Sequence, residues 1–329
     1  MSNRSIWIAL DESNAAFRPG DELRGKVHVS LEKESTIDSL PLVFEWYTHG
    51  KGNKASSTVR RLDLFQGKLF PGHRSYDFVF TVPDGPFTYH GHYLNVDWQL
   101  RTWLDIPWAI DPKFERRVAV FPTEGSVPAL ERTVDVHEAK SPLWVATILL
   151  ANVTAIVLLL VWAFGSFAQA GITHGLIGLG IAFVLGWVGF GLMRNRVAET
   201  QLGTVTVTVE PMAPGDDVLH VILVHHATPW TKLNAVTATF VVKEKVVRGS
   251  GTDAQTFTHG LFETEGALQV SPTDRRCYSA GFELEPKLPP SFAAPSNALL
   301  WDLTLHVDIA LWPDWLHTNS LTPLMRRPS

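Results

Sequence analysis

Two pairs of neighbouring histidines are the first candidates for chemistry in this chain. His90-Gly91-His92 would place two imidazoles on one face of a strand, as in some metal sites. No third ligand follows at a typical spacing, so we interpret these as solvent-exposed or turn histidines. His225-His226 would point to opposite faces of a strand and favours a metal site even less.

No other pattern indicates catalysis. Cys277 follows two arginines but has no identifiable base partner, and the carboxylates form no evident acid–base pair. There is no Gly-x-Ser-x-Gly elbow and no glycine-rich loop of the kind that holds phosphates. The sequence therefore predicts a protein that is not an enzyme and has no cofactor and no metal. The single cysteine cannot form an internal disulfide, which suits a reducing compartment.

Two basic stretches are candidate contact sites. The segment His49–Arg61 contains Lys51, Lys54, Arg60 and Arg61 and no acidic residue. A comparable position in the second half contains Lys243, Lys245 and Arg248, diluted by Glu244. These stretches are either solvated hairpin tips or contact sites for anionic lipid or an acidic partner. In a contact site, each Lys or Arg would contribute about 1 kcal/mol of binding free energy.

Two uncharged runs in the middle of the chain organise the rest. Residues 143–164 and 172–193 contain no Asp, Glu, Lys or Arg, and a short uncharged turn joins them. As helices, each would span roughly 33 Å, enough for a hydrocarbon core of ~30 Å. We therefore predict a transmembrane helical hairpin over residues 139–196, since buried helices of soluble proteins rarely run this long without charge.

Basic residues flank the hairpin and are missing from its turn. Arg132 and Lys140 precede the first span, and Arg194 and Arg196 follow the second. By the positive-inside rule both flanks are cytoplasmic and the turn faces outward, in a plasma or inner membrane. The beginning of the sequence does not resemble a secretory signal peptide.

Small residues recur every four positions in the second span, at Gly178, Ala182 and Gly186. Such a row lets another helix approach closely. The partner helix is either the first span or a second copy of the hairpin, which would make the protein a homo-oligomer.

Both flanking halves are typical of antiparallel β-structure. Apolar residues alternate in segments such as 6–10, 78–82, 205–209 and 219–223, and Pro- and Gly-rich turns separate these segments. We predict one β-sandwich over residues 1–138, a second over 203–316 and a tail over 317–329. The aromatic segment Trp312–Leu316 would either pack on the second sandwich or lie at the membrane interface.

The two halves share three anchors in the same order, which indicates an internal duplication. A Pro-Gly-Asp turn follows the first strand, and later a Trp precedes an Asp by the same interval in both copies. We interpret these as structural residues. They are Pro19, Gly20, Asp21, Trp98 and Asp105 in the first copy, and Pro214, Gly215, Asp216, Trp301 and Asp308 in the second.

These motifs resemble the arrestin fold, in its α-arrestin and sporulation-control (SpoOM-like) branch. In the first half the resemblance rests on Phe17-x-Pro19-Gly20-Asp21-x-Leu23-x-Gly25-x-Val27, Phe80-x-Val82-Pro83, Pro86-Phe87-Thr88-Tyr89-His90-Gly91 and Val96-x-Trp98-x-Leu100. In the second half it rests on Leu288-Pro289-Pro290-Ser291-Phe292 and Leu300-Trp301-x-Leu303. Ordinary members of the family are soluble, whereas here a hairpin occupies the connection between the domains.

The resemblance implies an adaptor or scaffold without catalytic activity. We expect it to be anchored in the lipid bilayer and to present both sandwiches to a cytoplasmic or membrane protein partner, with strand addition as one binding mode. The alternative is a structural subunit of a larger membrane transport or secretion complex, docked through its hairpin. A net charge of −5 with 19% charged residues does not favour nucleic acid as a partner.

Overall fold

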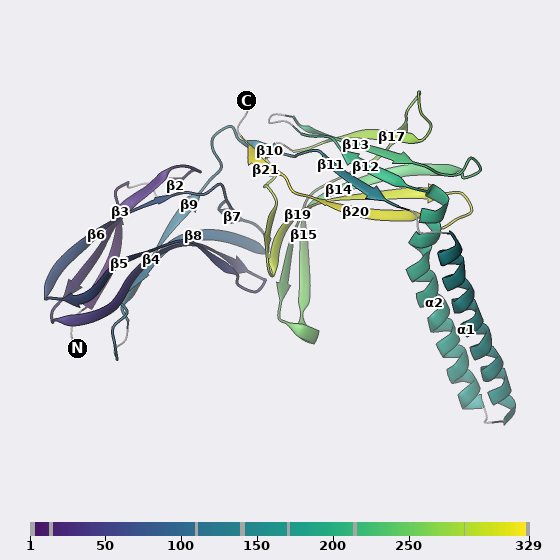
Figure 1. Ribbon diagram of the computed structural model, residues 1–329, viewed down its shortest axis with the longest axis horizontal. Coiled ribbons are helices and arrows are strands. Elements are labelled where there is room, and N and C mark those ends of the chain that lie inside the picture. Colours follow the sequence, from purple (N-terminus) through teal and green to yellow (C-terminus); the bar gives the residue numbers. More distant parts are fainter. Residues whose placement is uncertain are drawn as a thin grey trace.

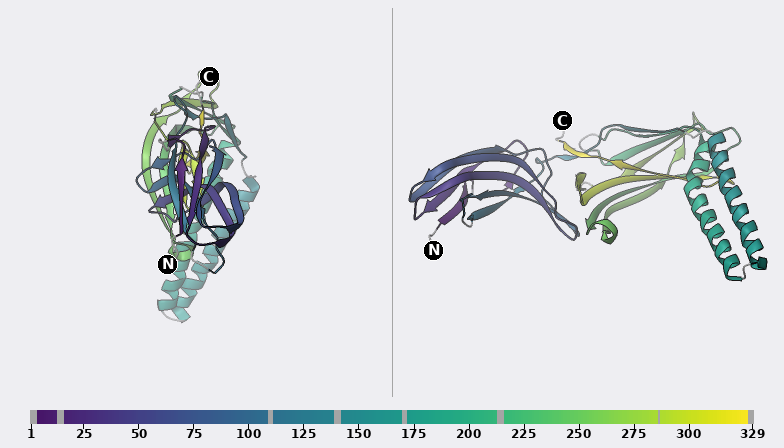
Figure 2. Two further views of the ribbon diagram at one scale, coloured as in Figure 1. Left: turned by 90° about the vertical axis from the view of Figure 1, so that its left-hand side faces the viewer. Right: turned by 60° about the horizontal axis from the view of Figure 1, so that its bottom comes forward.

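Two β-sandwiches lie side by side, and a helical hairpin projects from the second (Figures 1 and 2). This computed structural model describes residues 4–12, 16–108, 111–138, 142–169, 172–212, 216–285 and 287–326. The predicted fold class is confirmed: the chain is mostly antiparallel β, with two helices long and apolar enough to cross a membrane.

In two central strands of the first sandwich, Glu22–Leu31 and Leu94–Trp103, every second side chain is buried. Its sheets have the orders β1-β3-β6 and β2-β9-β8-β4-β5, with β7 also paired to β8. Leu23, Phe44 and Trp98 are fully buried between the sheets. The strands are β1 (Arg4–Leu10), β2 (Ala16–Phe17), β3 (Glu22–Leu31), β4 (Ser35–Gly50), β5 (Ser56–Leu69), β6 (Gly72–Thr81), β7 (Tyr89–His90), β8 (Leu94–Trp103) and β9 (Lys113–Val120).

The second sandwich repeats this architecture. Its sheets have the orders β11-β12-β13-β17-β16 and β15-β14-β19-β18, with β20 also paired to β19. Phe240, Trp301 and Trp315 are buried in its core. The elements are β11 (Thr133–His137), β12 (Val205–Val209), β13 (Val218–His225), β14 (Leu233–Arg248), η1 (Gly251–Asp253), β15 (Gln255–Ala267), β16 (Gln269–Val270), β17 (Cys277–Glu283), β18 (Phe292–Ala294), β19 (Asn297–Ile309) and β20 (Trp315–Leu321).

Strand pairing divides the chain differently from the predicted boundaries. β11 pairs along its whole length with β12 of the second sandwich, and the short β10 (Val127–Ala129) pairs with β21 (Leu324–Arg326). The boundary between the sandwiches therefore falls after Val120 rather than at 138. The segment expected to be a tail supplies β21 and most of β20. Alternation in five residues identifies a strand but not its partner, so the sequence could not settle this point.

Equivalent strands of the two sandwiches are in the same register. Phe44 lies opposite Leu100 in the first sandwich, and Phe240 lies opposite Leu303 in the second. The β4–β5 and β14–β15 hairpins are therefore counterparts, as the shared sequence anchors predict.

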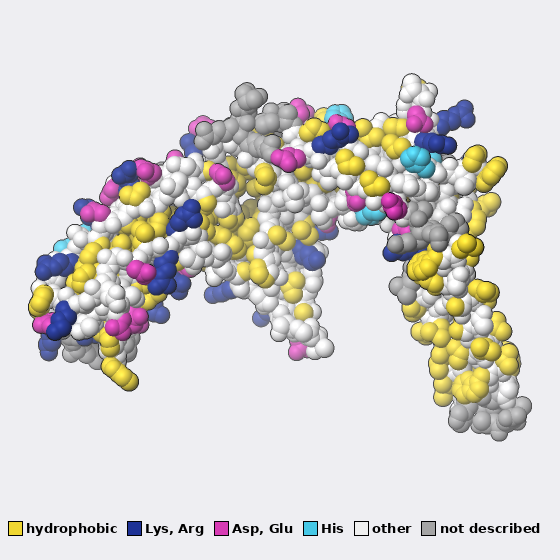
Figure 3. All heavy atoms as spheres, in the orientation of Figure 1, with side chains coloured by type: hydrophobic (Ala, Val, Ile, Leu, Met, Phe, Trp, Pro, Cys, Tyr) yellow, Lys and Arg dark blue, Asp and Glu magenta, His cyan; other side chains and the backbone are white. Residues whose placement is uncertain are grey.

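The helices α1 (Pro142–Gln169) and α2 (Ile172–Leu202) extend beyond the predicted spans. α2 continues because Ala198 and Leu202 are buried in the core of the second sandwich. It ends at Gly203, which has a φ of +68° and whose backbone N–H bonds to the carbonyl of Glu199. Only 6% of the most apolar part of α1 and 12% of that of α2 is buried. Figure 3 shows hydrophobic side chains over the surface of the hairpin. Core helices of a soluble protein would be mostly buried.

The row of small residues on α2 packs against α1. A Cβ on Gly178 would lie 2.7 Å from the Cβ of Ala163, and Ala182 is buried. Gly186 is next to Ile156, at 3.6 Å by the same measure. Of the two alternatives, the structure therefore uses this face within the hairpin.

Candidate functional site

A buried carboxylate joins the two sandwiches. Glu244 on β14 is fully buried and accepts a hydrogen bond at 2.6 Å from the hydroxyl of Tyr89 in the first sandwich. Its two oxygens also accept bonds from the backbone N–H groups of His92 (2.9 Å), Tyr93 (2.6 Å) and Leu94 (3.1 Å). This turn approaches the carboxylate closely at Gly91, where a Cβ would overlap the Glu244 oxygen. One side chain thus binds a whole turn of the other sandwich.

The hydrogen bonds decide the charge of Glu244. Burial raises the pKa of this carboxyl group, but the bonds from Tyr89 and from the backbone of Tyr93, His92 and Leu94 together outweigh burial and lower it below its ordinary value. Burial, and then the bond to Glu244, raise the pKa of Tyr89, so the phenol remains a donor. The pair therefore consists of an ionised acceptor and a neutral donor at neutral pH.

A second polar contact lies at the tips of the equivalent hairpins. Asn297 is buried and donates to the hydroxyl of Thr48 at 2.9 Å and to the carbonyl of Asn53 at 2.7 Å. Asn53 in turn exchanges two bonds with the backbone of Gly249, at 2.8 and 3.0 Å. Bonds between the sandwiches therefore run in both directions here, whereas at Glu244 the second sandwich only accepts them.

Apolar side chains fill the space between these two polar contacts. Leu94 and Val96 of the first sandwich pack with Val246 and Leu299 of the second, and all four are buried. The contact therefore combines burial of apolar surface with hydrogen bonds whose geometry fixes how the sandwiches dock.

A cavity of about 720 Å³ opens beside this contact. Trp46 of the first sandwich and Phe292 of the second meet edge to face in its lining, with ring centroids 5.5 Å apart. Phe87, Pro289 and Leu324 continue an apolar lining drawn from both sandwiches. Such a cavity could take an apolar side chain of a peptide or a small apolar ligand.

The two predicted basic stretches come together in this region, where the backbone N–H of Asn53 bonds to the carbonyl of Val247 at 2.8 Å. This pairing was not predicted. Lys51 lies over the rings of Tyr93 (4.5 Å) and Phe257 (3.8 Å), at the junction of the sandwiches. Lys243 forms an ion pair with Asp302 at 2.8 Å. Both lysines therefore stabilise the protein itself.

The other predicted basic residues face solvent. Arg61 pairs with the neighbouring Asp63 at 3.1 Å. The remaining four, which stay candidates for contact with lipid or a partner, are Lys54, Arg60, Lys245 and Arg248.

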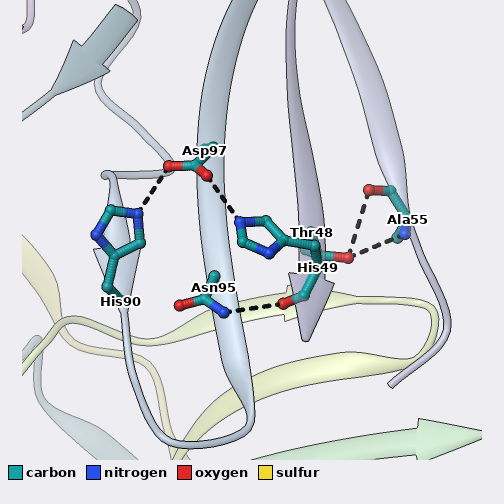
Figure 4. A network of polar contacts seen from close by, with 6 residues as sticks. All are labelled: Thr48, His49, Ala55, His90, Asn95 and Asp97. Atoms are coloured by element: carbon teal, nitrogen blue, oxygen red, sulfur yellow. Dashed lines mark hydrogen bonds and ion pairs between the residues drawn. The ribbon is translucent and has the colours of Figure 1, made fainter. Parts of the chain in front are cut away.

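The histidines of the predicted His-Gly-His motif have separate roles. His90 and His49 both contact Asp97, at 2.8 and 2.7 Å and through different oxygens (Figure 4). Burial raises the pKa of Asp97, but the hydrogen bonds from His90 and His49 outweigh it and lower the pKa. His92 instead stacks on His259 of the second sandwich, with ring centroids 4.4 Å apart. The arrangement connects β4, β7 and β8 and adds a ring contact between the sandwiches.

The tryptophans of the sequence repeat are equivalent in the structure. The indole Nε1 of Trp98 donates to the carbonyl of Pro86 at 2.8 Å, and that of Trp301 donates to Pro289 at 2.9 Å. Each bond fastens a proline segment to the core tryptophan of the same sandwich, and both proline segments line the cavity.

The Asp anchors of the repeat also occupy equivalent places. Asp105 bridges to Ser39 just before the long pairing of β4, and Asp308 pairs with Ala235 at the start of β14.

The Pro-Gly-Asp turns can be compared only in part. The first is closed by Asp21, whose carboxylate accepts a bond from the Arg18 N–H at 2.7 Å, and Gly20 between Pro19 and Asp21 has a φ of +86°. In the second turn, Pro214 and Gly215 lie outside the described residues, and Asp216 lies beside a small cavity.

Exposed apolar side chains surround the base of the hairpin. Trp230, Leu311 and Trp312 are exposed on the two loops where the second sandwich meets α2. These loops are joined by a bond from the N–H of Ala310 to the carbonyl of Lys232 at 2.9 Å. Trp315, from the same aromatic segment, is buried in the sandwich core, so this residue adopts the first predicted placement, packing on the second sandwich.

Neither the Glu244 contact nor the cavity was predicted. Glu244 lies between two lysines and resembles a charge on a solvated strand. Its only sequence signal is that it alternates in phase with Val242 and Val246, which are both buried.

No family model and no curated protein matches the chain. Among solved structures, the chain is similar to Spo0M, the sporulation control protein of Bacillus subtilis. The identity is 12%, the match covers 78% of this chain and 90% of that one, and the TM-score is 0.32. At this TM-score the similarity carries no argument, and the family resemblance of the motifs stays a prediction.

Proposed function

We propose that the protein is a membrane-anchored adaptor that holds two β-sandwiches as one rigid body and presents them to a protein partner. The observation that carries this proposal is the contact of Glu244 with the turn at residues 91–94. A buried charge with four donors favours one fixed arrangement of the sandwiches. A fixed arrangement is useful to a protein whose role is to offer a composite surface.

Membrane anchoring is supported by the hairpin and by the residues at its base. The helices expose apolar side chains almost everywhere outside their mutual contact. Trp230 and Trp312 lie where the helices enter the second sandwich, and aromatic side chains favour the interface between lipid and water. Arg194 and Arg196 follow the apolar part of α2 and favour a cytoplasmic location for both sandwiches.

The partner in this proposal is an extended acidic segment of another protein. β5 and β15 are long strands at the ends of their sheet orders, where backbone groups are free to pair with an added strand. Arg60 on β5 and Lys54 just before it are exposed and favour an acidic ligand. An apolar residue of such a ligand would fit the cavity beside Trp46.

The proposed role is binding without catalysis. Two polar side chains converge at the junction, Glu244 and Asn297. Both make hydrogen bonds between the sandwiches. Cys277 lies half-buried on β17, opposite Val224.

A second candidate is a subunit of a larger membrane complex. It is favoured by the outward face of α2, where Phe183 and Trp187 stack on one another and are exposed. In this case the hairpin would dock on other spans through that face, since the row Gly178–Gly186 is already occupied by α1.

Site-specific photocrosslinking in intact membranes tests the adaptor proposal. A crosslinking residue at Leu62, exposed on β5, should capture one reproducible protein, while the same residue at Val79, exposed on β6 of the opposite sheet, should not. Reproducible crosslinks from Trp187 with none from Leu62 would favour the complex subunit. Equal labelling from Leu62 and Val79 would contradict a specific edge-strand partner.

A further inference from the structure

The pattern of side chains on β11 is inverted. In Thr133–His137 the two valines, Val134 and Val136, are exposed, while Asp135 and His137 turn toward the protein. An ordinary edge strand would bury its valines and expose its charged residues. Burying polar groups costs free energy unless a partner satisfies them.

The inward residues of β11 face a histidine from the opposite sheet. β11 is the edge strand of one sheet of the second sandwich, and His317 comes from β20, which pairs with β19 in the other sheet. The Nε2 of His317 lies 3.1 Å from Oδ2 of Asp135, and the Nε2 of His137 lies 3.1 Å from the same oxygen. The three atoms all lie within 4.8 Å of one another.

Protein contacts alone leave this cluster incompletely satisfied. His317 makes a hydrogen bond to Asp135. His137 approaches the same oxygen outside hydrogen-bond geometry, so its buried Nε2 has no hydrogen-bond partner among the described residues. A second buried imidazole nitrogen therefore points at the carboxylate without a bond, which costs free energy unless something else binds there.

We propose that Asp135, His137 and His317 form a binding site for a divalent transition-metal ion, with Zn²⁺ as the preferred ion. Around a tetrahedral Zn²⁺, with bonds of about 2.0–2.2 Å to nitrogen and oxygen, neighbouring ligand atoms are about 3.3 Å apart. The two separations of 3.1 Å are close to that value. Two imidazoles and one carboxylate favour zinc over magnesium or calcium, which prefer oxygen ligands.

Ring contacts orient the ligands of the cluster. The ring centroids of His137 and His317 lie 3.9 Å apart. His317 is further held by stacking on Trp315, with ring centroids 5.5 Å apart. The ligands are thus oriented before an ion arrives.

The location suggests what the ion does. β11 leads directly toward α1, and Leu316, next to His317, accepts a hydrogen bond at 3.2 Å from Asn195 of α2. An ion here would fasten the edges of the two sheets at the point where both helices leave the sandwich. It would stabilise the joint between the hairpin and the rest of the protein.

Zinc titration of the full chain tests the site. The protein is purified in detergent without a histidine tag, treated with EDTA and titrated with Zn²⁺ against a chromophoric indicator. The wild type should bind one tightly held ion per chain. His137→Ala and His317→Ala should weaken binding by more than about 100-fold, since losing an outer-shell partner alone costs about 10- to 100-fold.

A matched control separates this site from ordinary histidine pairs. His28 and His73 on the first sandwich also approach each other, with ring nitrogens 3.2 Å apart. The His28→Ala/His73→Ala variant should retain wild-type zinc affinity. Asp135→Asn preserves the size of the side chain and should also weaken zinc binding. This variant tests the site even if the alanine variants fail to fold.

Cobalt provides a readout on the unaltered protein. Co²⁺ bound at the site should give the intense visible absorption of a four-coordinate ion. The proposal is overturned if the wild type binds no stoichiometric zinc, or if folded His137→Ala or Asp135→Asn protein binds zinc as tightly as the wild type.

Discussion

The carboxylate of Glu244 accepts a hydrogen bond from the hydroxyl of Tyr89 at 2.6 Å, across the boundary between the two sandwiches. Because the same carboxylate binds three backbone N–H groups, this contact is the polar centre of the junction. Its removal is therefore the most direct test of whether the sandwiches move as one body.

Glu244→Ala should release the sandwiches from their fixed arrangement. It removes the acceptor for four donors, and unsatisfied buried donors cost about 1–3 kcal/mol each if they cannot reach water. We expect a loss of about 2–5 kcal/mol of docking free energy. Spin labels at exposed Ser57 and Thr273 should show one narrow distance distribution in the wild type and a broad one in the variant. An unchanged distribution would show that apolar packing alone fixes the arrangement. Glu283→Ala, an exposed change on β17, is the control.

Acid should weaken the same junction. The pKa of Glu244 is lowered in the docked state, so its stabilising contribution is fully present above the ordinary glutamate pKa of about 4.3 and is lost as pH falls through the lowered value. The spin-label distances should therefore broaden below about pH 4 and recover on neutralisation. Glu244→Gln should remove this part of the pH dependence. A transition with the same midpoint in Glu244→Gln would assign it to another group.

Gly91→Ala should also undock the sandwiches, through sterics alone. A Cβ at this position would overlap the Glu244 carboxylate and the ring of Tyr89. We expect the thermal unfolding midpoint to fall and the spin-label distances to broaden. Gly260→Ala on β15 is the matched control, because its added Cβ would meet no atom within 4 Å. Equal effects of the two changes would argue against close packing at the turn.

The elements with strong patterns could be predicted from the sequence, whereas the contacts between them could not. The runs from Leu143 and Ile172 are long and uncharged, so composition alone identifies the hairpin. Tyr89 and Glu244 are 155 residues apart, and nothing local distinguishes this glutamate from a solvated one. The Asp135-x-His137 pattern does carry a local signal: the valines at 134 and 136 alternate with Asp135 and His137, so the strand has one apolar and one polar face. Only the pairing of β11 with β12 shows which face is inward.

Gly178→Leu should separate the two helices of the hairpin. Its side chain would collide with Ala163 and Trp162 of α1, where a Cβ alone would come within 2.7 Å. Gly180→Leu should be tolerated, since a Cβ there would meet no atom within 4 Å. Disulfide formation between cysteines at Asn152 and Gly189, which face each other where a Cβ at 189 would lie 2.9 Å from the Cγ of Asn152, should fall in the first variant and persist in the second. Equal crosslinking in both variants would contradict the packing of α1 on α2.

The topology prediction is tested by thiol labelling in intact cells. In a Cys277→Ser background, single cysteines replace exposed Ser57 in the first sandwich, Thr273 in the second and Gly165 near the tip of the hairpin. A membrane-impermeant reagent should label only the cysteine at 165, and permeabilised cells should add 57 and 273. Labelling of 57 and 273 but not 165 in intact cells would place the sandwiches outside. Labelling of all three would mean that the hairpin does not cross the bilayer, because residues at opposite ends of two spanning helices cannot both face the medium.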